Sequence, residues 1–196
     1  MNTTDRHHWD TRHGAAPPAP VGERFPYPIL AGLEAHMPHR GHCLELACGQ
    51  GRSAVWLALR GMTVHGVDIS PVAIRQARAL AAGAGVGDRC HFAVTDLDNG
   101  LPDTPGVDLL LCHNFRDPRL YGAMMARLAP GGLLAVATLS EVGAAPGRFR
   151  AQSGELRSAF TALTALDEGE SSGRAWFLGQ NRSPAEIAHE DNLPRG

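Results

Sequence analysis

Residues 42–52, HCLELACGQGR, pass from an apolar run directly into a glycine-rich loop. His42–Leu46 has the composition of a buried strand, and RSAVWLALR at Arg52–Arg60 has that of a helix. A strand, a glycine loop and a helix in this order are typical of the first unit of a parallel α/β sheet. Such sheets bind ligands at the carboxyl ends of their strands, where Gly49 and Gly51 let a ligand lie against the backbone.

Short strands alternate with helical patterns along the rest of the chain. Further strands are predicted at Thr63–Val67, Cys90–Thr95, Val107–Cys112 and Leu133–Leu139, with two final ones near 162–168 and 174–180. Helices are predicted after Ser70–Pro71, from Asp117–Pro118 to about Leu128, and over Glu155–Phe160. This alternation predicts an α/β fold with a Rossmann-like, doubly wound sheet of seven strands, closed by an antiparallel hairpin.

The chain is expected to hold one domain between two less structured ends. Residues 1–28 contain few apolar side chains and the proline-rich AAPPAPVG, which indicates a flexible N-terminal arm, or a flap that orders on a ligand. Residues 29–180 form the domain, and residues 181–196 form a C-terminal tail. A length of 196 residues, 43% of them hydrophobic, suits a single core.

Charge and composition exclude several classes of protein. A net charge of −2 gives no electrostatic basis for general nucleic-acid binding. No apolar run reaches the roughly 20 residues of a transmembrane helix, and the polar start MNTTDRHHWDTRHG does not read as a secretory signal. We therefore expect a cytoplasmic protein that binds neither nucleic acid nor membrane. The four cysteines form no CxxC pair and the ten histidines have no ligand spacing, so no metal is expected.

Three acidic residues end three successive predicted strands. Glu45 precedes the glycines, where a carboxylate repels a pyrophosphate and attracts an ammonium group. Asp68 can accept hydrogen bonds from both ribose hydroxyls of NAD or of any other adenosine compound. Asp96 can accept one from an adenine amino group while Leu97 packs on the ring. The three acids together predict a nucleoside cofactor that carries an ammonium group.

A nicotinamide cofactor is the alternative at this stage. Gly49, Gly51 and Ala54 also fit the dinucleotide-binding pattern G-x-G-x-x-G/A. All 18 basic residues are arginine, however, so a catalytic tyrosine–lysine pair is absent from the chain. A nicotinamide-dependent oxidoreductase is therefore the less favoured hypothesis.

As a set, the motifs ELACGQGR, VDIS, TDLD, VDLLLCHNF and LAPGGLLAV resemble those of the class I S-adenosylmethionine-dependent methyltransferases. The chain looks most like small single-domain bacterial members related to the tellurite-resistance methyltransferases, on the evidence of Trp9–Arg12, Cys48–Arg52 and Pro130–Gly132. The resemblance spans residues 9–180. It implies the sheet order 3-2-1-4-5-7-6 with an antiparallel last strand, S-adenosyl-L-methionine as cofactor and S-adenosyl-L-homocysteine as product.

The resemblance also implies a role for individual residues. Glu45 would anchor the methionine ammonium group, and Arg52 its carboxylate. Trp9 and Arg12 would close over the cofactor from the N-terminal arm. The other residues expected to contact the cofactor are Ala47, Cys48, Gly49, Gly51, Asp68, Ile69, Asp96, Leu97 and Cys112.

The methyl acceptor is expected beside the end of the fourth strand. Transfer from a sulfonium needs mainly alignment, and a base matters only for an acceptor that is protonated at neutral pH. His113 is the candidate base, Asn114 an orienting group and Phe115 a pocket wall, while Arg148 and Arg150 would meet an anionic acceptor.

With no basic face and no inserted recognition domain, the predicted acceptor is a small-molecule nucleophile that reacts through O, N, S or a chalcogen. The protein would act as a monomer or homodimer. A regulatory protein that binds S-adenosylmethionine without catalysis is the alternative from another class.

Overall fold

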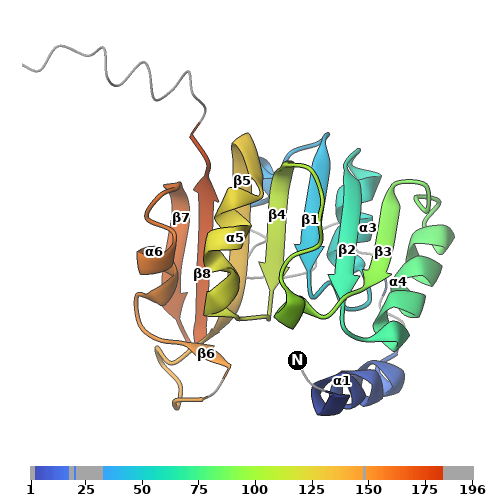
Figure 1. Ribbon diagram of the computed structural model, residues 1–196, viewed down its shortest axis with the longest axis horizontal. Coiled ribbons are helices and arrows are strands. Elements are labelled where there is room, and N and C mark those ends of the chain that lie inside the picture. Colours follow the sequence, from blue (N-terminus) through green and yellow to red (C-terminus); the bar gives the residue numbers. More distant parts are fainter. Residues whose placement is uncertain (1–2, 18–19, 21–32, 148, 183–196) are drawn as a thin grey trace, which may run out of the picture.

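The computed structural model describes residues 3–17, 20, 33–147 and 149–182, which fold around one mixed β-sheet (Figure 1). The strand order is β3-β2-β1-β4-β5-β8-β7, with β6 paired to β5. The strands are β1 (His42–Leu46), β2 (Thr63–Asp68), β3 (Cys90–Val94), β4 (Val107–His113), β5 (Leu128–Ser140), β6 (Arg150–Ala151), β7 (Thr164–Ser171) and β8 (Arg174–Gln180). The predicted order is confirmed, including the antiparallel pairing of β8 with β5 and β7.

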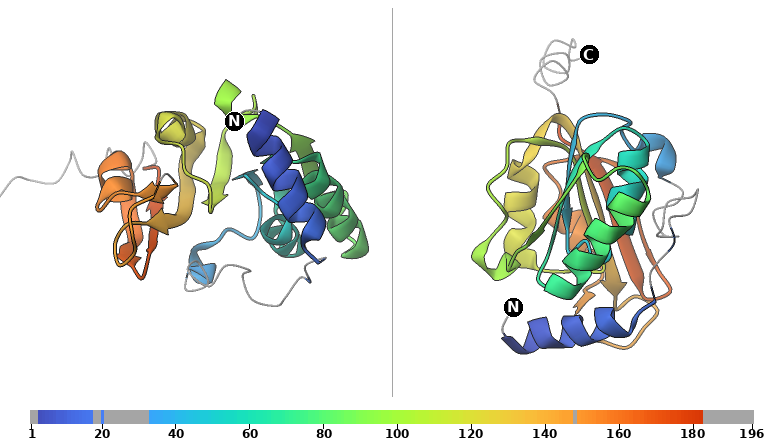
Figure 2. Two further views of the ribbon diagram at one scale, coloured as in Figure 1. Left: turned by 90° about the horizontal axis from the view of Figure 1, so that it is seen from below. Right: turned by 90° about the vertical axis from the view of Figure 1, so that its right-hand side faces the viewer.

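Helices cover both faces of the sheet (Figure 2). The helices are α1 (Thr3–Ala15), α3 (Arg52–Leu59), α4 (Pro71–Gly83), α5 (Tyr121–Ala126) and α6 (Glu155–Ala159), with short 3-10 turns at Glu34–His36, Leu97–Asn99 and Pro118–Leu120. Ser70 caps α4 as predicted, because its hydroxyl accepts a hydrogen bond from the backbone N–H of Ala73 at 3.1 Å.

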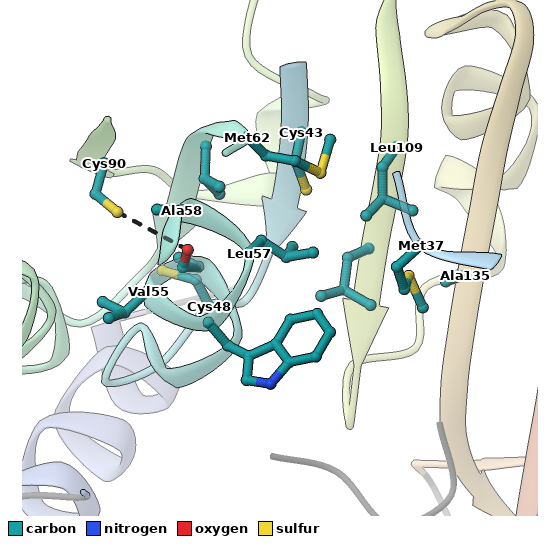
Figure 3. Packing of buried hydrophobic residues seen from close by; sticks show 14 of the residues in the cluster. Met37, Cys43, Cys48, Val55, Leu57, Ala58, Met62, Cys90, Leu109 and Ala135 are labelled. Atoms are coloured by element: carbon teal, nitrogen blue, oxygen red, sulfur yellow. Dashed lines mark hydrogen bonds between the residues drawn. The ribbon is translucent and has the colours of Figure 1, made fainter. Parts of the chain in front are cut away.

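Alternate residues of the central strands enter two separate hydrophobic clusters, as expected for a sheet that is buried on both faces. Leu109 and Leu111 of β4 belong to the cluster that packs against α3 and α4. Leu110 and Cys112 belong to the cluster that packs against α5 and α6. Figure 3 shows part of the first cluster, in which Leu57 of α3 lies against the central strands.

Three elements differ from the sequence predictions. The sheet has an eighth strand, β6, whose two residues pair with the end of β5. β5 begins at Leu128 and includes Pro130–Gly132, which we expected to form the turn before it. The helix expected from Pro118 to about Leu128 is a 3-10 turn followed by α5, which ends at Ala126.

The N-terminal prediction also needs correction, because residues 3–15 form α1 rather than an arm without regular structure. This helix is mostly polar, so apolar periodicity gave no signal for it. In Figure 1, α1 lies next to α4, below the edge at which β1, β2 and β4 end. The rest of the predicted arm, apart from residues 16, 17 and 20, and residues 183–196 of the predicted tail lie outside the described residues.

Two properties bear on the class of protein. The helices of the described ranges are too short or too polar to cross a membrane. Within the same ranges, the structure brings together no group of three or more histidine, cysteine, aspartate or glutamate side chains that could hold a metal ion.

Candidate functional site

The glycine loop leaves β1 in a tight turn that sets the geometry of the site. Ala47, Gly49 and Gly51 have φ of 52°, 53° and 74°, all in the left-handed region. The backbone N–H of Cys48 donates to the carbonyl of Val67 at 2.9 Å, which fixes the loop to the end of β2. α3 then begins at Arg52, so the helix N-terminus lies at the carboxyl edge of the sheet.

The two glycines of the loop have different surroundings. A Cβ on Gly51 would lie 2.8 Å from Cβ of Ala77 and 3.0 Å from Cζ of Phe92. α4 and β3 therefore fill the space that we expected a ligand to use at Gly51. A Cβ on Gly49 would lie 3.4 Å from Cε1 of His13, so Gly49 faces α1.

Glu45 is a buried acid with one oxygen that lacks a partner. Its side chain is 1% exposed, and Oε1 accepts a hydrogen bond from the hydroxyl of Ser53. No group of the described residues bonds Oε2. Burial raises the pKa of Glu45 to about 8, although the bonds from Ser53 and the Ala54 backbone oppose this shift. The side chain is therefore a neutral acid at pH 7 in the ligand-free protein, and a cationic group at Oε2 would favour its ionised form.

Arg52 complements Glu45 at the start of α3. Its Nε is buried and has no hydrogen-bond partner among the described residues. A vacant acidic oxygen and a vacant guanidinium nitrogen are complementary to an ammonium group and a carboxylate, which an amino acid carries on one carbon. The residues present therefore fit the methionine part of S-adenosylmethionine.

Asp68 ends β2 and holds the glycine loop. Its Oδ2 accepts the N–H of Gly49 and its Oδ1 accepts the N–H of Ser70, both at 2.9 Å. The side chain is 6% exposed, and burial is the main cause of its raised pKa, against which these two bonds act. Each carboxylate oxygen has a further lone pair, so the group remains able to accept ribose hydroxyls.

The residues predicted to enclose an adenine ring follow β2 and β3. Ile69 and Leu97 are both buried. Asp96 precedes Leu97, and its Oδ1 accepts the N–H of Asp98 at 3.0 Å to cap the 3-10 turn. The structure thus places all three residues after the carboxyl ends of neighbouring strands.

α1 reaches the site through residues that we did not predict from the sequence. The hydroxyl of Ser70 donates to Asp10 Oδ1, and Gln76 Nε2 donates to the carbonyl of His13 at 3.0 Å. Burial lowers the pKa of His13 while the nearby Asp68 raises it, so these two side chains lie close together. In the sequence, only the three-residue spacing of Asp10 and His13 could have indicated this contact, because it places both residues on one face of a helix.

The two α1 residues that we did predict lie less directly at the site. The guanidinium of Arg12 is 5.4 Å from the centre of the Trp9 ring, and Arg12 is exposed. Trp9 is half-buried, and its ring centre lies 5.9 Å from that of His13. Contact of Trp9 and Arg12 with a cofactor stays a prediction.

Cys48 and Cys112 lie in different clusters on opposite faces of the sheet. The thiol of Cys112 donates to the carbonyl of Phe115 at 3.5 Å. Burial raises the pKa of Cys48 well above its usual value and that of Cys112 to about 12, so both remain protonated thiols. Their side chains pack in the interior, and contact of either residue with a cofactor stays a prediction.

His113 is the last residue of β4, and Asn114 follows it. Both lie next to the glycine loop, because Leu46 and Cys112 are register partners in β1 and β4. Burial, and secondarily the charge of Arg174, lower the pKa of His113 to about 3. Asn114 has φ of 57°, and its Oδ1 accepts a hydrogen bond from Nη1 of Arg174 at 2.7 Å. Arg174 was not predicted, because the first residue of a terminal hairpin strand carries no motif.

Arg150 has a structural role in the loop after β5. Its Nη1 donates to the carbonyls of Ser140 at 2.7 Å and Gly173 at 3.2 Å, so it ties the loop after β5 to the β7–β8 turn. Contact of Arg150 with an acceptor stays a prediction. Arg148 lies outside the described residues.

Comparison with known proteins indicates a methyltransferase domain. Residues 43–132 match the family model described as "Methyltransferase domain". The chain is 38% identical over 85 residues to 2-heptyl-1-hydroxyquinolin-4(1H)-one methyltransferase of Mycobacteroides abscessus. This match covers 43% of this chain and 36% of the relative. It is also 34% identical over 107 residues to tRNA 5-carboxymethoxyuridine methyltransferase of Escherichia coli K12. This match covers 50% of this chain and 40% of the relative.

The fold is similar to that of TehB from Haemophilus influenzae, with a TM-score of 0.70, 18% identity and coverage of 80% of this chain and 62% of that one. The sheet order and the matched domain define a Rossmann-like methyltransferase domain. Residues 43–132 thus carry a methyltransferase domain, which supports the resemblance of the motifs to the class I S-adenosylmethionine-dependent methyltransferases. The chain spans about a third of the length of the first curated relatives it matches.

Proposed function

We propose that this protein transfers a methyl group from S-adenosyl-L-methionine to a small-molecule nucleophile and releases S-adenosyl-L-homocysteine. The observation that carries this proposal is the pair of vacant buried atoms, Glu45 Oε2 and Arg52 Nε, at the end of β1. A cationic group at Oε2 would favour ionisation of Glu45, whereas a pyrophosphate would oppose it, which disfavours the nicotinamide alternative.

The chain's own residues bind and orient in this reaction. Glu45 and Arg52 hold the two charged groups of the methionine part, and Asp68 accepts the ribose hydroxyls. When bound, S-adenosylmethionine supplies an electrophilic methyl group on a sulfonium. Because this displacement relieves charge, alignment of the acceptor at the end of β4 supplies most of the rate.

A small acceptor, cytoplasmic action as a monomer or homodimer, and no partnership with nucleic acid or membrane all belong to this proposal. The net charge of −2 supports a small molecule over a nucleic acid. The named acceptors of relatives include both kinds, a hydroxyquinolone and a tRNA base.

Incubation with S-adenosylmethionine labelled in the methyl group tests the activity directly. We expect label to pass to members of a panel of hydroxyl, carboxylate, amine and thiol compounds, with one S-adenosylhomocysteine released per methyl transferred. Transfer to bulk tRNA but to no small compound would contradict the acceptor class. Tight cofactor binding with no transfer to any acceptor would favour the regulatory alternative.

A further inference from the structure

Three strand ends meet beside the proposed methyl-transfer site. Because β8 runs antiparallel to β5, its first residues lie at the edge where β4 and β5 end. Ala137 of β5 is the register partner of both His113 and Trp176, and Leu139 is that of Arg174. The N–H of Asn114 donates to the carbonyl of Ala137 at 2.8 Å, which holds Asn114 at this edge.

Arg174 reaches from β8 past β5 to Asn114, where Nη1 and Oδ1 are 2.7 Å apart. This bond uses one of the five N–H donors of a guanidinium, and the amide of Asn114 keeps its Nδ2 donors. Both residues are at least partly exposed to solvent. The geometry therefore gathers hydrogen-bond donors and a positive charge next to the end of β4.

The charge of Arg174 is not matched by a carboxylate in the described part of the chain. Some arginines also bond neutral oxygens, as Arg150 bonds the carbonyls of Ser140 and Gly173. Others have acidic partners: Arg116 forms an ion pair with Glu155, and Arg119 forms ion pairs with Asp117 and Asp98. Arg174 has a neutral amide instead. A fixed arginine with a neutral partner and spare donors is suited to a carboxylate or another oxyanion.

His113 adds a reason for the acceptor to arrive already ionised. With its pKa lowered to about 3, His113 is neutral at pH 7 and holds an accepted proton only weakly. An acceptor that has already lost its proton needs no base.

We propose that Arg174, positioned by Asn114, selects a small organic oxyanion as the methyl acceptor, either a carboxylate or an acidic hydroxyl that is ionised at neutral pH. This inference rests on the proposed function. A lone pair of the anionic oxygen forms the new O–CH3 bond, the C–S bond breaks, and its electron pair stays on sulfur. No proton is released, and the neutral ester or ether that results loses its attraction to Arg174.

Binding to the protein saturated with S-adenosylhomocysteine tests this selectivity without turnover. Isothermal titration calorimetry at fixed ionic strength would compare benzoate and nicotinate with their neutral amides, benzamide and nicotinamide. We expect the carboxylates to bind about tenfold more tightly than the amides, as for a charged hydrogen bond. Equal affinities, or no binding of either kind, would overturn the proposal.

Two variants locate the selectivity. Asn114→Asp preserves the side-chain shape and tolerates the left-handed backbone, but it places a carboxylate against Arg174. Arg174→Gln removes the charge itself. Each should reduce the preference for carboxylates to about onefold while S-adenosylhomocysteine affinity stays within about twofold of wild type.

Arg89→Gln is the matched control, because Arg89 is exposed next to the start of β3, at the opposite edge of the sheet. It should retain the full carboxylate preference. If Arg89→Gln lowers the preference as much as Arg174→Gln does, net charge explains the effect and the proposal fails. If S-adenosylhomocysteine does not bind wild type at all, the proposed function fails instead.

Discussion

Glu45 is a buried acid, and its Oε2 has no partner among the described residues, so this oxygen can contact a cation. Glu45→Gln keeps its shape and removes its ability to ionise. We expect S-adenosylhomocysteine affinity to fall about tenfold or more, measured by calorimetry at pH 8, because an amide cannot match the ligand's ammonium charge. Unchanged affinity in Glu45→Gln would contradict the assignment of the ammonium site.

The raised pKa of Glu45 also predicts how stability depends on pH. Between its usual value of 4.5 and about 8, the unfolded chain releases this proton while the folded protein keeps it. The free energy of unfolding of the ligand-free protein should therefore fall as pH rises through this interval. Urea unfolding at pH 5 and pH 8 should show a smaller fall for Glu45→Gln than for wild type.

The exposed Asp103 supplies the control, since Asp103→Asn should retain the wild-type dependence. An equal fall in Glu45→Gln and wild type would show that Glu45 ionises normally in the folded protein.

Asp68 has a structural and a binding role at once. Asp68→Asn keeps one oxygen acceptor for the two N–H groups that the carboxylate holds, so we expect a loss of about 1–3 kcal/mol in the free energy of unfolding. Affinity for S-adenosylhomocysteine should fall by about tenfold or more as well. Retention of wild-type affinity would remove Asp68 from the ribose site.

At the scale of elements, the packing of α4 and β3 on the glycine loop depends on Gly51. Gly51→Ala would place a Cβ 2.8 Å from Ala77 and 3.0 Å from Phe92, at a φ of 74°. Overpacking and backbone strain together should reduce the free energy of unfolding by about 2–5 kcal/mol, measured in urea.

Gly85→Ala is the matched control, because Gly85 has φ of 73° but a Cβ there would meet no neighbouring group of the described residues within 4 Å. It isolates the backbone strain, about 1–2 kcal/mol. Equal costs at both positions would show that packing at Gly51 contributes nothing.

α1 is the element whose attachment is easiest to test. Asp10→Ala removes the acceptor of the Ser70 hydroxyl and leaves the rest of the helix intact. We expect faster amide hydrogen exchange throughout α1, with a smaller effect from Arg6→Ala, since Arg6 is exposed. If Asp10→Ala exchanges no faster than Arg6→Ala, the bond to Ser70 does not hold α1 in place.

At the scale of the whole molecule, parallel strands bring residues distant in sequence to one edge. Glu45, Asp68 and Asp96 were predictable because each follows an apolar run, and the ends of parallel strands meet. Burial of both faces of the sheet was predictable as well, since the core strands are apolar on both faces.

Other features depend on contacts that local pattern does not encode. α1 is polar and is fixed by Asp10 and by the carbonyl of His13. Arg174 reaches Asn114 only because an antiparallel strand returns its first residue to the same edge. The surroundings of Gly51 likewise follow from the packing of α4 and β3.

Thermal unfolding with S-adenosylhomocysteine, S-adenosylmethionine, NAD and NADP at equal concentrations distinguishes an S-adenosylmethionine site from a nicotinamide site. A ligand at about 100 times its Kd adds about 2.7 kcal/mol, which for a domain of this size raises Tm by roughly 5–10 °C. We predict such a rise with the two adenosyl ligands alone, and its loss in Glu45→Gln. A rise with NAD or NADP alone would contradict the assignment of this site to S-adenosylmethionine.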